Sequence, residues 1–412
     1  DWSSDVCSSD LLSMKDVVIV SACRTPIGKF LGMFKDVSAR ELAMTAGKEA
    51  INRAGIEPAV IDNVVVGQVY AGMQGSLPAK QISYRLGCPP ESNACVVNQN
   101  CASGMRALEI ACDNIAMGKS EIGLVIGVEN MTQAPYMLPK ARGGYRMGNA
   151  EVVDSMLHDA LIDELSGGHM GVTAENVAKM YGITREECDE LALRSHRLAC
   201  KAIDEGKFKE EIVPVEVKMK KKTILATEDE HPIRDCNMET LSKLRPAFIK
   251  DGVVTAANAS GINDAAAAVV VMSLDKAKEL GVKPLLKMIN ICAAGVKPEI
   301  MGVGPAEAIP KALKLAGLKY EDVDYWEINE AFAPQFIGCG RQLEKNHGIK
   351  INMDRTNVNG SGIALGHPIG CTALRIIVSM YYEMKRNDYK IGGAALCVGT
   401  GPAMASLWTT EI

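Results

Sequence analysis

Two cysteines and a histidine stand in sequence settings that could make them reactive, and Cys101 is the first of them. Cys101 follows an apolar, strand-like run and directly precedes a segment with helical periodicity. The free N–H groups and the dipole at a helix N-terminus stabilise a thiolate, so we expect a lowered pKa and a nucleophilic sulfur. The alternative is a buried structural cysteine, which fits most of the thirteen cysteines of the chain.

His367 lies in a glycine-rich segment, residues 357–370 (NVNGSGIALGHPIG). So many glycines indicate a backbone that approaches another group closely or takes a positive φ. A neutral imidazole there could donate a hydrogen bond to an oxyanion or take a thiol proton. The alternative is a histidine that caps a loop carbonyl, but the glycine density favours the chemical interpretation.

Cys397 ends an apolar run at a glycine turn that includes Gly399. Ligands of α/β sheets bind beyond the carboxyl ends of strands, and glycine amides beside a sulfur could form an oxyanion hole. Taken alone, a cysteine in an apolar strand is more often part of the core. Asn329 could fix a catalytic water with its side chain, although an Asn at a helix start is most often an N-cap.

The elements that must position these residues alternate along the chain. Strands are expected at residues 17–20, 94–97, 122–128 and 267–272, and helices at residues 39–54 and 106–117. The alternation predicts an α/β fold with helices on both sides of the sheets.

One pattern occurs twice in the same order. Gly55 ends a helical segment and Asp62 follows seven residues later, and Gly317 and Asp324 repeat this spacing. A later helix of each copy contains Ala-Leu-x-Ile, at residues 107–110 and 373–376. Duplication of one αβ unit explains this order better than chance.

The repeat suggests a division of the chain. Residues 1–13 (DWSSDVCSSDLLS) lack periodicity, and we expect a non-native or disordered leader. Residues 14–131, completed by about 259–284, form the N-terminal core half, and residues 285–412 form the C-terminal half. Residues 132–258 interrupt the repeat and predict an inserted, mostly helical and loop-rich domain.

Composition excludes several classes of protein. The chain has 412 residues, of which 47% are hydrophobic and 23% charged, which is typical of a globular protein. Its net charge is -5 and it has no long basic face, so we expect no nucleic acid partner. The longest apolar run, residues 265–272, is far shorter than the roughly 20 residues of a membrane span. The scattered cysteines, without Cys-x-x-Cys spacing, favour a reducing, cytoplasmic setting and no bound metal.

Taken together, these segments resemble the thiolase family over residues 15–412. Four motifs stand in the family's order and spacing, at residues 100–104 (NCASG), 329–332 (NEAF), 366–370 (GHPIG) and 397–399 (CVG). The resemblance implies a thiolase-like five-layered αβαβα core from two duplicated halves, with the inserted loop domain covering CoA. It implies no prosthetic group, because CoA thioesters are the substrates.

The resemblance also implies a mechanism. Cys101, assisted by His367, takes the acetyl group of one acetyl-CoA and releases CoA. Cys397 removes an α-proton from a second acetyl-CoA, and the enolate attacks the acetyl group to give acetoacetyl-CoA; the reverse reaction is thiolysis. A water on Asn329 and the imidazole hold the enolate, while the N–H groups of Cys101 and Gly399 hold the tetrahedral intermediate.

Residues of the loop domain and its border are implied to contact CoA. Ser260 matches the family serine near the pantetheine, and Leu244 and Phe248 belong to the adjoining loop. Arg234 resembles the basic residue next to the adenine, displaced by one position. Residues 220–222, three lysines, could attract phosphates, although a charge run is usually a solvated face.

Two segments bear on chain length and assembly. His169 and Met170 stand where short-chain, biosynthetic-type members wall the acyl pocket, which implies an acetyl-CoA acetyltransferase; the alternative is a broader-chain degradative 3-ketoacyl-CoA thiolase. Residues 142–148 resemble the loop through which biosynthetic-type members form homotetramers, as dimers of dimers. Ser361 and Thr400 stand where glycines are common in the family, which could alter the backbone around the catalytic groups.

Other activities would use only part of this set. A ketoacyl synthase would share the fold and Cys101 but would place His or Asn where Cys397 stands. A cysteine hydrolase would need a Cys-His pair with water access and no CoA pocket. A non-catalytic CoA-binding scaffold would lose the sulfurs, so the presence of both sulfurs and His367 favours the thiolase.

Overall fold

The computed structural model describes residues 14–412, and the leader expected at residues 1–13 lies outside the described residues. Ten strands form one mixed sheet in the order β14-β15-β16-β13-β1-β12-β5-β3-β4, with β2 paired to β12. The N-terminal strands are β1 (Val17–Arg24), β2 (Gly28–Lys29), β3 (Asn63–Gly67), β4 (Asn93–Val97), β5 (Ile122–Asn130) and β12 (Asn263–Ser273). The C-terminal strands are β13 (Leu286–Gly295), β14 (Tyr325–Ile328), β15 (Ile391–Cys397) and β16 (Pro402–Thr409).

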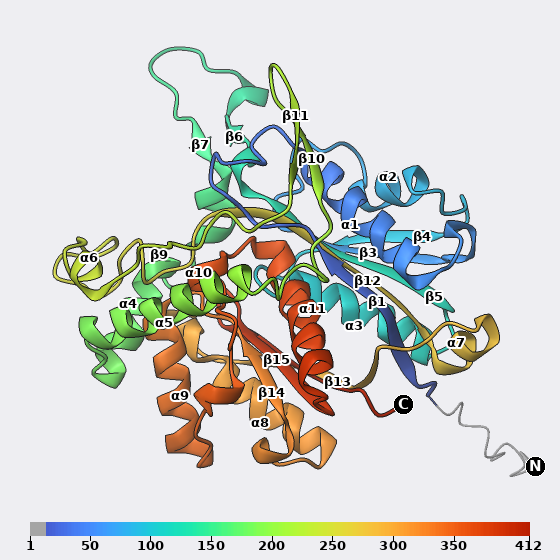
Figure 1. Ribbon diagram of the computed structural model, residues 1–412. Helices are drawn as coiled ribbons and strands as arrows, with labels where there is room; N and C mark the ends of the chain where they lie inside the picture. The colour runs from blue at the N-terminus through green and yellow to red at the C-terminus, as the bar shows by residue number, and fades with distance from the viewer. Residues whose placement is uncertain (1–13) are drawn as a thin grey trace, which may run out of the picture.

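The N-terminal and the C-terminal strands are joined by two residue pairs between β1 and β13. The mixed sheet therefore divides into an N-terminal and a C-terminal sheet that meet at one edge. Helices α3 (Ser103–Ala116) and α11 (Ile369–Asn387) pack between the two sheets, and α11 contacts strands of both (Figure 1). Helices α1 (Ala39–Ala54) and α2 (Pro78–Arg85) cover the outer face of the N-terminal sheet, and α8 (Pro305–Ala316) covers the C-terminal one, with α9 (Ala333–His347) beside it. The predicted five-layered αβαβα core is confirmed.

The apolar runs explain why these strands are central. All residues of β1, β5 and β12 are buried, as expected for strands with helices on both faces. The predicted helix at residues 39–54 coincides with α1, which begins with a capping box between Ser38 and Glu41 and ends at Gly55 with φ 67°.

The two halves repeat each other in three dimensions. Strand β3 pairs parallel to β5, and β14 pairs parallel to β15. The carboxylate of Asp62 accepts the N–H groups of Glu121 and Ile122 at the start of β5. The carboxylate of Asp324 accepts the N–H groups of Lys390 and Ile391 at the start of β15. The predicted duplication therefore extends to equivalent hydrogen bonds.

A long segment separates β5 from β12, and in Figure 1 it covers the top and the left side of the core. It contains the short strands β6 (Tyr136–Met137), β7 (Val153–Asp154), β8 (Ile162–Asp163) and β9 (Gly168–His169), the hairpin of β10 (Val215–Lys218) and β11 (Thr223–Ala226), and the helices α4 (Met170–Tyr181), α5 (Arg185–Asp204) and α6 (Met238–Ser242). The hairpin and the loop between β6 and β7 extend away from the core. Within residues 14–412 no helix is long and apolar enough to cross a bilayer.

Candidate active site

One cavity of about 350 Å³ lies where the two halves and the inserted segment meet. Its lining includes Asn100, Cys101, Met131, Ala160, Leu161, His169, Met170, Phe248, Ser260, Met301, Phe332, His367, Ile369, Cys397 and Gly399. A larger groove of about 630 Å³, between α1 and β10, contains none of the predicted site residues. The smaller cavity is therefore the candidate active site.

Cys101 lies between β4 and α3, one residue before the N-cap of the helix, and is partly exposed to the cavity. Burial raises the pKa of its thiol to about 11, although the N–H groups of Gly399 and of Cys101 itself act in the opposite direction. The expected lowering of this pKa is wrong, because the loss of water on burial outweighs the effect of the helix terminus. The thiol is neutral and needs a base.

His367 can supply that base. Its Nδ1 lies 2.6 Å from the Thr372 hydroxyl, which donates to the Pro368 carbonyl at 3.0 Å. Since that hydroxyl proton is already used, Nδ1 carries the imidazole proton and Nε2 is left to accept. Nε2 has no hydrogen-bond partner among residues 14–412. Burial, and then the charge of Arg375, lower the pKa of His367 to about 3. The loop-capping alternative is wrong.

Cys397 is the last residue of β15, as predicted from its apolar run. It packs with Met170, Met301 and Phe332 in one apolar cluster. Burial raises the pKa of its thiol well above the ordinary value, and the nearby Cys101 sulfur raises it further. The two sulfurs thus oppose each other's ionisation.

Asn329 directly follows β14, and its side chain is fully buried. Neither Oδ1 nor Nδ2 has a partner among the described residues. The N-cap of α9 is Phe332, so the N-cap alternative for Asn329 is wrong. A buried amide without protein partners is suited to hold a water molecule.

Aromatic rings line part of the cavity. The rings of His169 and Phe248 stack with centroids 4.6 Å apart, and Phe332 meets Phe248 edge-on at 6.1 Å. His169 is the N-cap of α4 and accepts the Gly171 N–H at Nδ1. Ser260 is fixed by its N–H, which donates to the Ala331 carbonyl. The cavity is therefore largely apolar, with Ser260 and His367 among its few polar side chains.

Known proteins share this arrangement. The thiolase N-terminal domain matches residues 17–275 and the thiolase C-terminal domain matches residues 282–410. The chain belongs to the thiolase family. An acetyl-CoA acetyltransferase of Syntrophomonas wolfei is 48% identical over 95% of this chain and 98% of that protein.

Solved thiolase structures agree with this assignment. A structure of an acetyl-CoA acetyltransferase from Syntrophomonas wolfei has a TM-score of 0.96 and 57% identity, covering 97% of this chain and 100% of that one. Human mitochondrial 3-ketoacyl-CoA thiolase in complex with CoA has a TM-score of 0.91 and 37% identity, covering 97% and 99%. The fold and family inferred from the motifs are confirmed.

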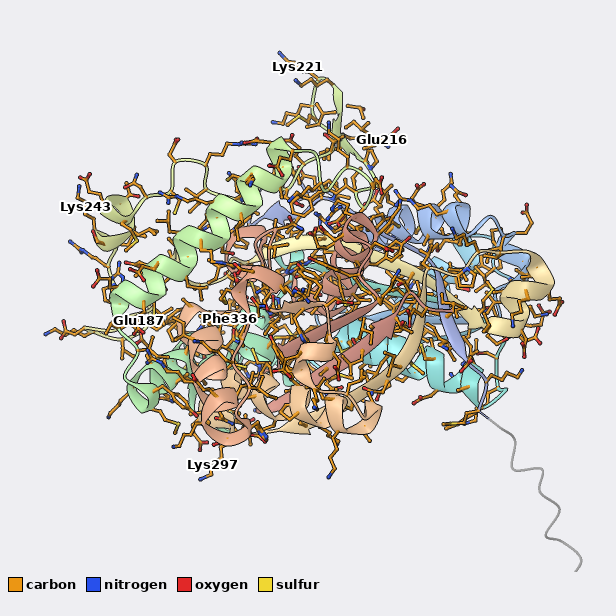
Figure 2. All side chains as sticks on the ribbon, turned by 60° about the horizontal axis from the view of Figure 1, so that its bottom comes forward. Glu187, Glu216, Lys221, Lys243, Lys297 and Phe336 are labelled. Carbon is orange, nitrogen blue, oxygen red and sulfur yellow. The ribbon has the colours of Figure 1, made fainter. Side chains whose placement is uncertain are left out.

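Some predicted residues of this thiolase lie elsewhere. Arg234 is exposed and pairs with Asp204 at 2.8 Å, and neither Arg234 nor Leu244 lines the cavity. The lysines at residues 220–222 are exposed, and Figure 2 shows Lys221 at the outer end of the hairpin. The structure therefore does not bring these side chains together with the two cysteines and His367.

Sequence reasoning missed several residues of the site. Met131 and Met301 line the cavity from short 3-10 helices, and an isolated apolar side chain carries no signal of its own in the sequence. Glu129 and Asn263 carried a signal, because each is a polar residue at or next to one end of a strand whose interior is apolar.

The two departures from family glycines differ in their effect. Ser361 has φ -145°, an extended conformation that any residue adopts. Thr400 has φ 76° in the turn that follows Cys397 and Gly399. A β-branched residue in the left-handed region is strained, so only Thr400 carries a backbone cost.

Proposed function

We propose that this thiolase is an acetyl-CoA C-acetyltransferase, which joins two acetyl-CoA molecules into acetoacetyl-CoA and CoA through an acetyl-Cys101 intermediate and also runs in reverse. The observation that carries the proposal is that one cavity holds two thiols, a neutral imidazole and a glycine amide, that of Gly399, whose N–H meets the Cys101 sulfur. CoA thioesters are the substrates, and no prosthetic group takes part.

In the first half-reaction, Nε2 of His367 takes the thiol proton of Cys101, and the sulfur attacks the thioester carbonyl. The N–H groups of Gly399 and Cys101 stabilise the oxyanion of the tetrahedral intermediate. CoA leaves as a thiolate and takes the proton of Cys397. The enzyme then holds an acetyl group on Cys101 and a thiolate at Cys397.

In the second half-reaction, the Cys397 thiolate removes an α-proton from the second acetyl-CoA. His367 and a water on Asn329 hold the enolate oxygen while the enolate carbon attacks the acetyl group. Cys101 leaves as a thiolate and recovers its proton from His367. Acetylation of Cys101 also keeps that sulfur uncharged, so no second thiolate opposes the ionisation of Cys397.

Substrate length follows from the wall of the cavity. Met170 and Met301 pack in one apolar cluster with Cys397, and the stacked rings of His169 and Phe248 line the same cavity. We therefore infer a preference for the short acyl chain. The test is thiolysis of acetoacetyl-CoA beside 3-ketodecanoyl-CoA, and equal kcat/KM values would favour the degradative alternative.

We further infer a homotetramer, a dimer of dimers, in a reducing, cytoplasmic setting. Strand β4 ends the sheet and is partly exposed along its length, so its free edge can pair with a second copy. The arm between β6 and β7 carries the exposed Tyr145 and Met147. The cysteines of residues 14–412 are all free thiols, which fits a reducing setting. Light scattering after size exclusion should give four chain masses.

We also propose the domain division predicted from the sequence, with residues 132–258 as the CoA-binding insertion. The cavity-lining Leu161, His169 and Phe248 come from this segment. Arg234 stays a predicted contact next to the adenine of CoA, and Leu244 stays a predicted contact in the loop that adjoins Ser260. Alanine substitution of either should raise KM for CoA more than it lowers kcat.

A further inference from the structure

The loop that carries His367 belongs to the C-terminal half but is held by two side chains of the N-terminal half. Oδ1 of Asn263, at the start of β12, accepts the main-chain N–H of His367 at 2.9 Å. Oε2 of Glu129, near the end of β5, accepts the N–H of Gly370 at 2.9 Å. One bond therefore lies at each end of residues 367–370.

The two glycines of this loop are explained by the same side chains. A Cβ on Gly366, which has φ 101°, would lie 2.5 Å from Cγ of Asn263. A Cβ on Gly370 would lie 2.7 Å from Oε2 of Glu129 and 2.6 Å from the Val128 carbonyl. Any larger residue would displace the holding group, so the spacing of the GHPIG motif matches the two contacts.

The holding side chains are themselves fixed. Both are fully buried. Nδ2 of Asn263 donates to the Gly28 carbonyl at 3.0 Å. The Glu129 carboxylate also accepts the N–H groups of Val69 and Tyr70, each at 3.0 Å. Three backbone groups from both halves therefore share one carboxylate, which leaves it little freedom to move.

We infer that Glu129 and Asn263 are positioning residues for His367, which set the imidazole of one half against the Cys101 sulfur of the other. Neither side chain lines the cavity, so they act through the loop and do not touch substrate. The inference rests on the proposed role of His367 as the base. A misplacement of about 1 Å can cost about 100-fold in rate, so a small shift of this loop has a measurable effect.

The test compares Glu129→Gln and Asn263→Ala with wild type. The glutamine keeps the shape of Glu129 but leaves one acceptor oxygen for three N–H groups. We expect the alkylation rate of Cys101 by iodoacetamide, and kcat for thiolysis of acetoacetyl-CoA, to fall about 10- to 100-fold. KM should stay within about twofold of the wild-type value, because the residues that line the cavity are unchanged. If Glu129→Gln does not fold, Gly370→Ala displaces the same carboxylate without removing it.

Asp324→Asn is the matched control. Asp324 also accepts two backbone N–H groups through its carboxylate, but it lies at the start of β14, away from the cavity. Its substitution should leave the alkylation rate unchanged. An equal loss of rate in Asp324→Asn would mean that any weakened backbone contact has the same effect, and would overturn the inference.

His367→Ala distinguishes the proposed role of the imidazole from the positioning role of Glu129 and Asn263. In the His367→Ala background, Glu129→Gln should change the alkylation rate by less than about twofold, because the effects of residues that act through one group are not additive. If His367→Ala itself reacts at the wild-type rate, the proposed function of the imidazole fails. If His367→Ala is slow but the folded variants Glu129→Gln and Asn263→Ala react at the wild-type rate, only the positioning role is overturned. The same holds if the rate losses of His367→Ala and Glu129→Gln multiply in the double variant.

Discussion

Nδ1 of His367 and the hydroxyl of Thr372 lie 2.6 Å apart at the N-terminal end of α11, where Thr372 belongs to the first turn and His367 precedes the N-cap Pro368. This contact keeps the imidazole proton on Nδ1, so that Nε2 can receive a proton. The low pKa, about 3, keeps the ring neutral at ordinary assay pH. The site therefore pairs a neutral base with a neutral thiol.

The pH dependence of Cys101 alkylation tests this state. The pKa of Cys101 is raised to about 11 and that of His367 is lowered to about 3, so neither group changes its charge between about pH 5 and pH 8. Alkylation by iodoacetamide with help from the neutral imidazole should therefore be independent of pH over that range in wild type. In His367→Ala the rate should be lower and should rise about tenfold per pH unit, because it then follows the thiolate fraction of Cys101 alone. A wild-type rate that rises in the same way would show that the imidazole takes no part in the reaction.

Cys397→Ala should separate the two half-reactions. Acetyl transfer to Cys101 retains its nucleophile, imidazole and oxyanion donors, so mass spectrometry should still locate an acetyl group on Cys101, formed more slowly because CoA leaves unprotonated. Condensation should fall about 10²–10⁴-fold with the loss of the base. Cys101→Ala, the control, should lose both steps. Near-wild-type acetoacetyl-CoA formation by folded Cys397→Ala would show that Cys397 is a structural core residue and not the base.

Gly171→Ala should weaken CoA thioester binding. A Cβ at this position would overlap the ring of Phe248, and a rigid ring has to move as a whole. We expect a KM about tenfold higher, with a smaller change in kcat, because displacement of the Phe248 ring acts on substrate binding in the cavity. Adding Gly171→Ala to Phe248→Ala should have little further effect. A full additional loss in the double variant would contradict the proposed contact.

Thr400→Gly should stabilise the fold. Relief of the left-handed conformation is worth about 1–2 kcal/mol, and the added freedom of glycine in the unfolded chain costs about 0.5–1 kcal/mol. Denaturant unfolding should therefore show a gain of up to about 1 kcal/mol. Gly401→Ala in the same turn has φ 108° and would crowd the Val296 carbonyl, so it should destabilise. Equal effects of the two substitutions would argue against strain at Thr400.

The sequence predicted what depends on local pattern. Cys101, His367 and Cys397 each stand at the boundary of a strand or helix with a recognisable periodicity, so their places in the fold followed from that pattern. The pKa of Cys101 could not be predicted from local pattern, because the burial of its thiol depends on cavity residues that are distant in sequence, such as Met131 and Ile369. The bond between Asn263 and His367 joins residues 104 positions apart, and only tertiary packing brings them together.

The carboxylates of Asp62 and Asp324 have a consequence for the evolution of the proposed duplicated halves. Each half keeps its own carboxylate bonds between two strands, whereas the proposed reactive groups are divided, with Cys101 in one half and His367 and Cys397 in the other. On this proposal neither half could carry out the reaction alone. Because these carboxylate bonds are present in both halves and do not involve the residues of the cavity, loop residues of the site can change without loss of the strand pairing in either half.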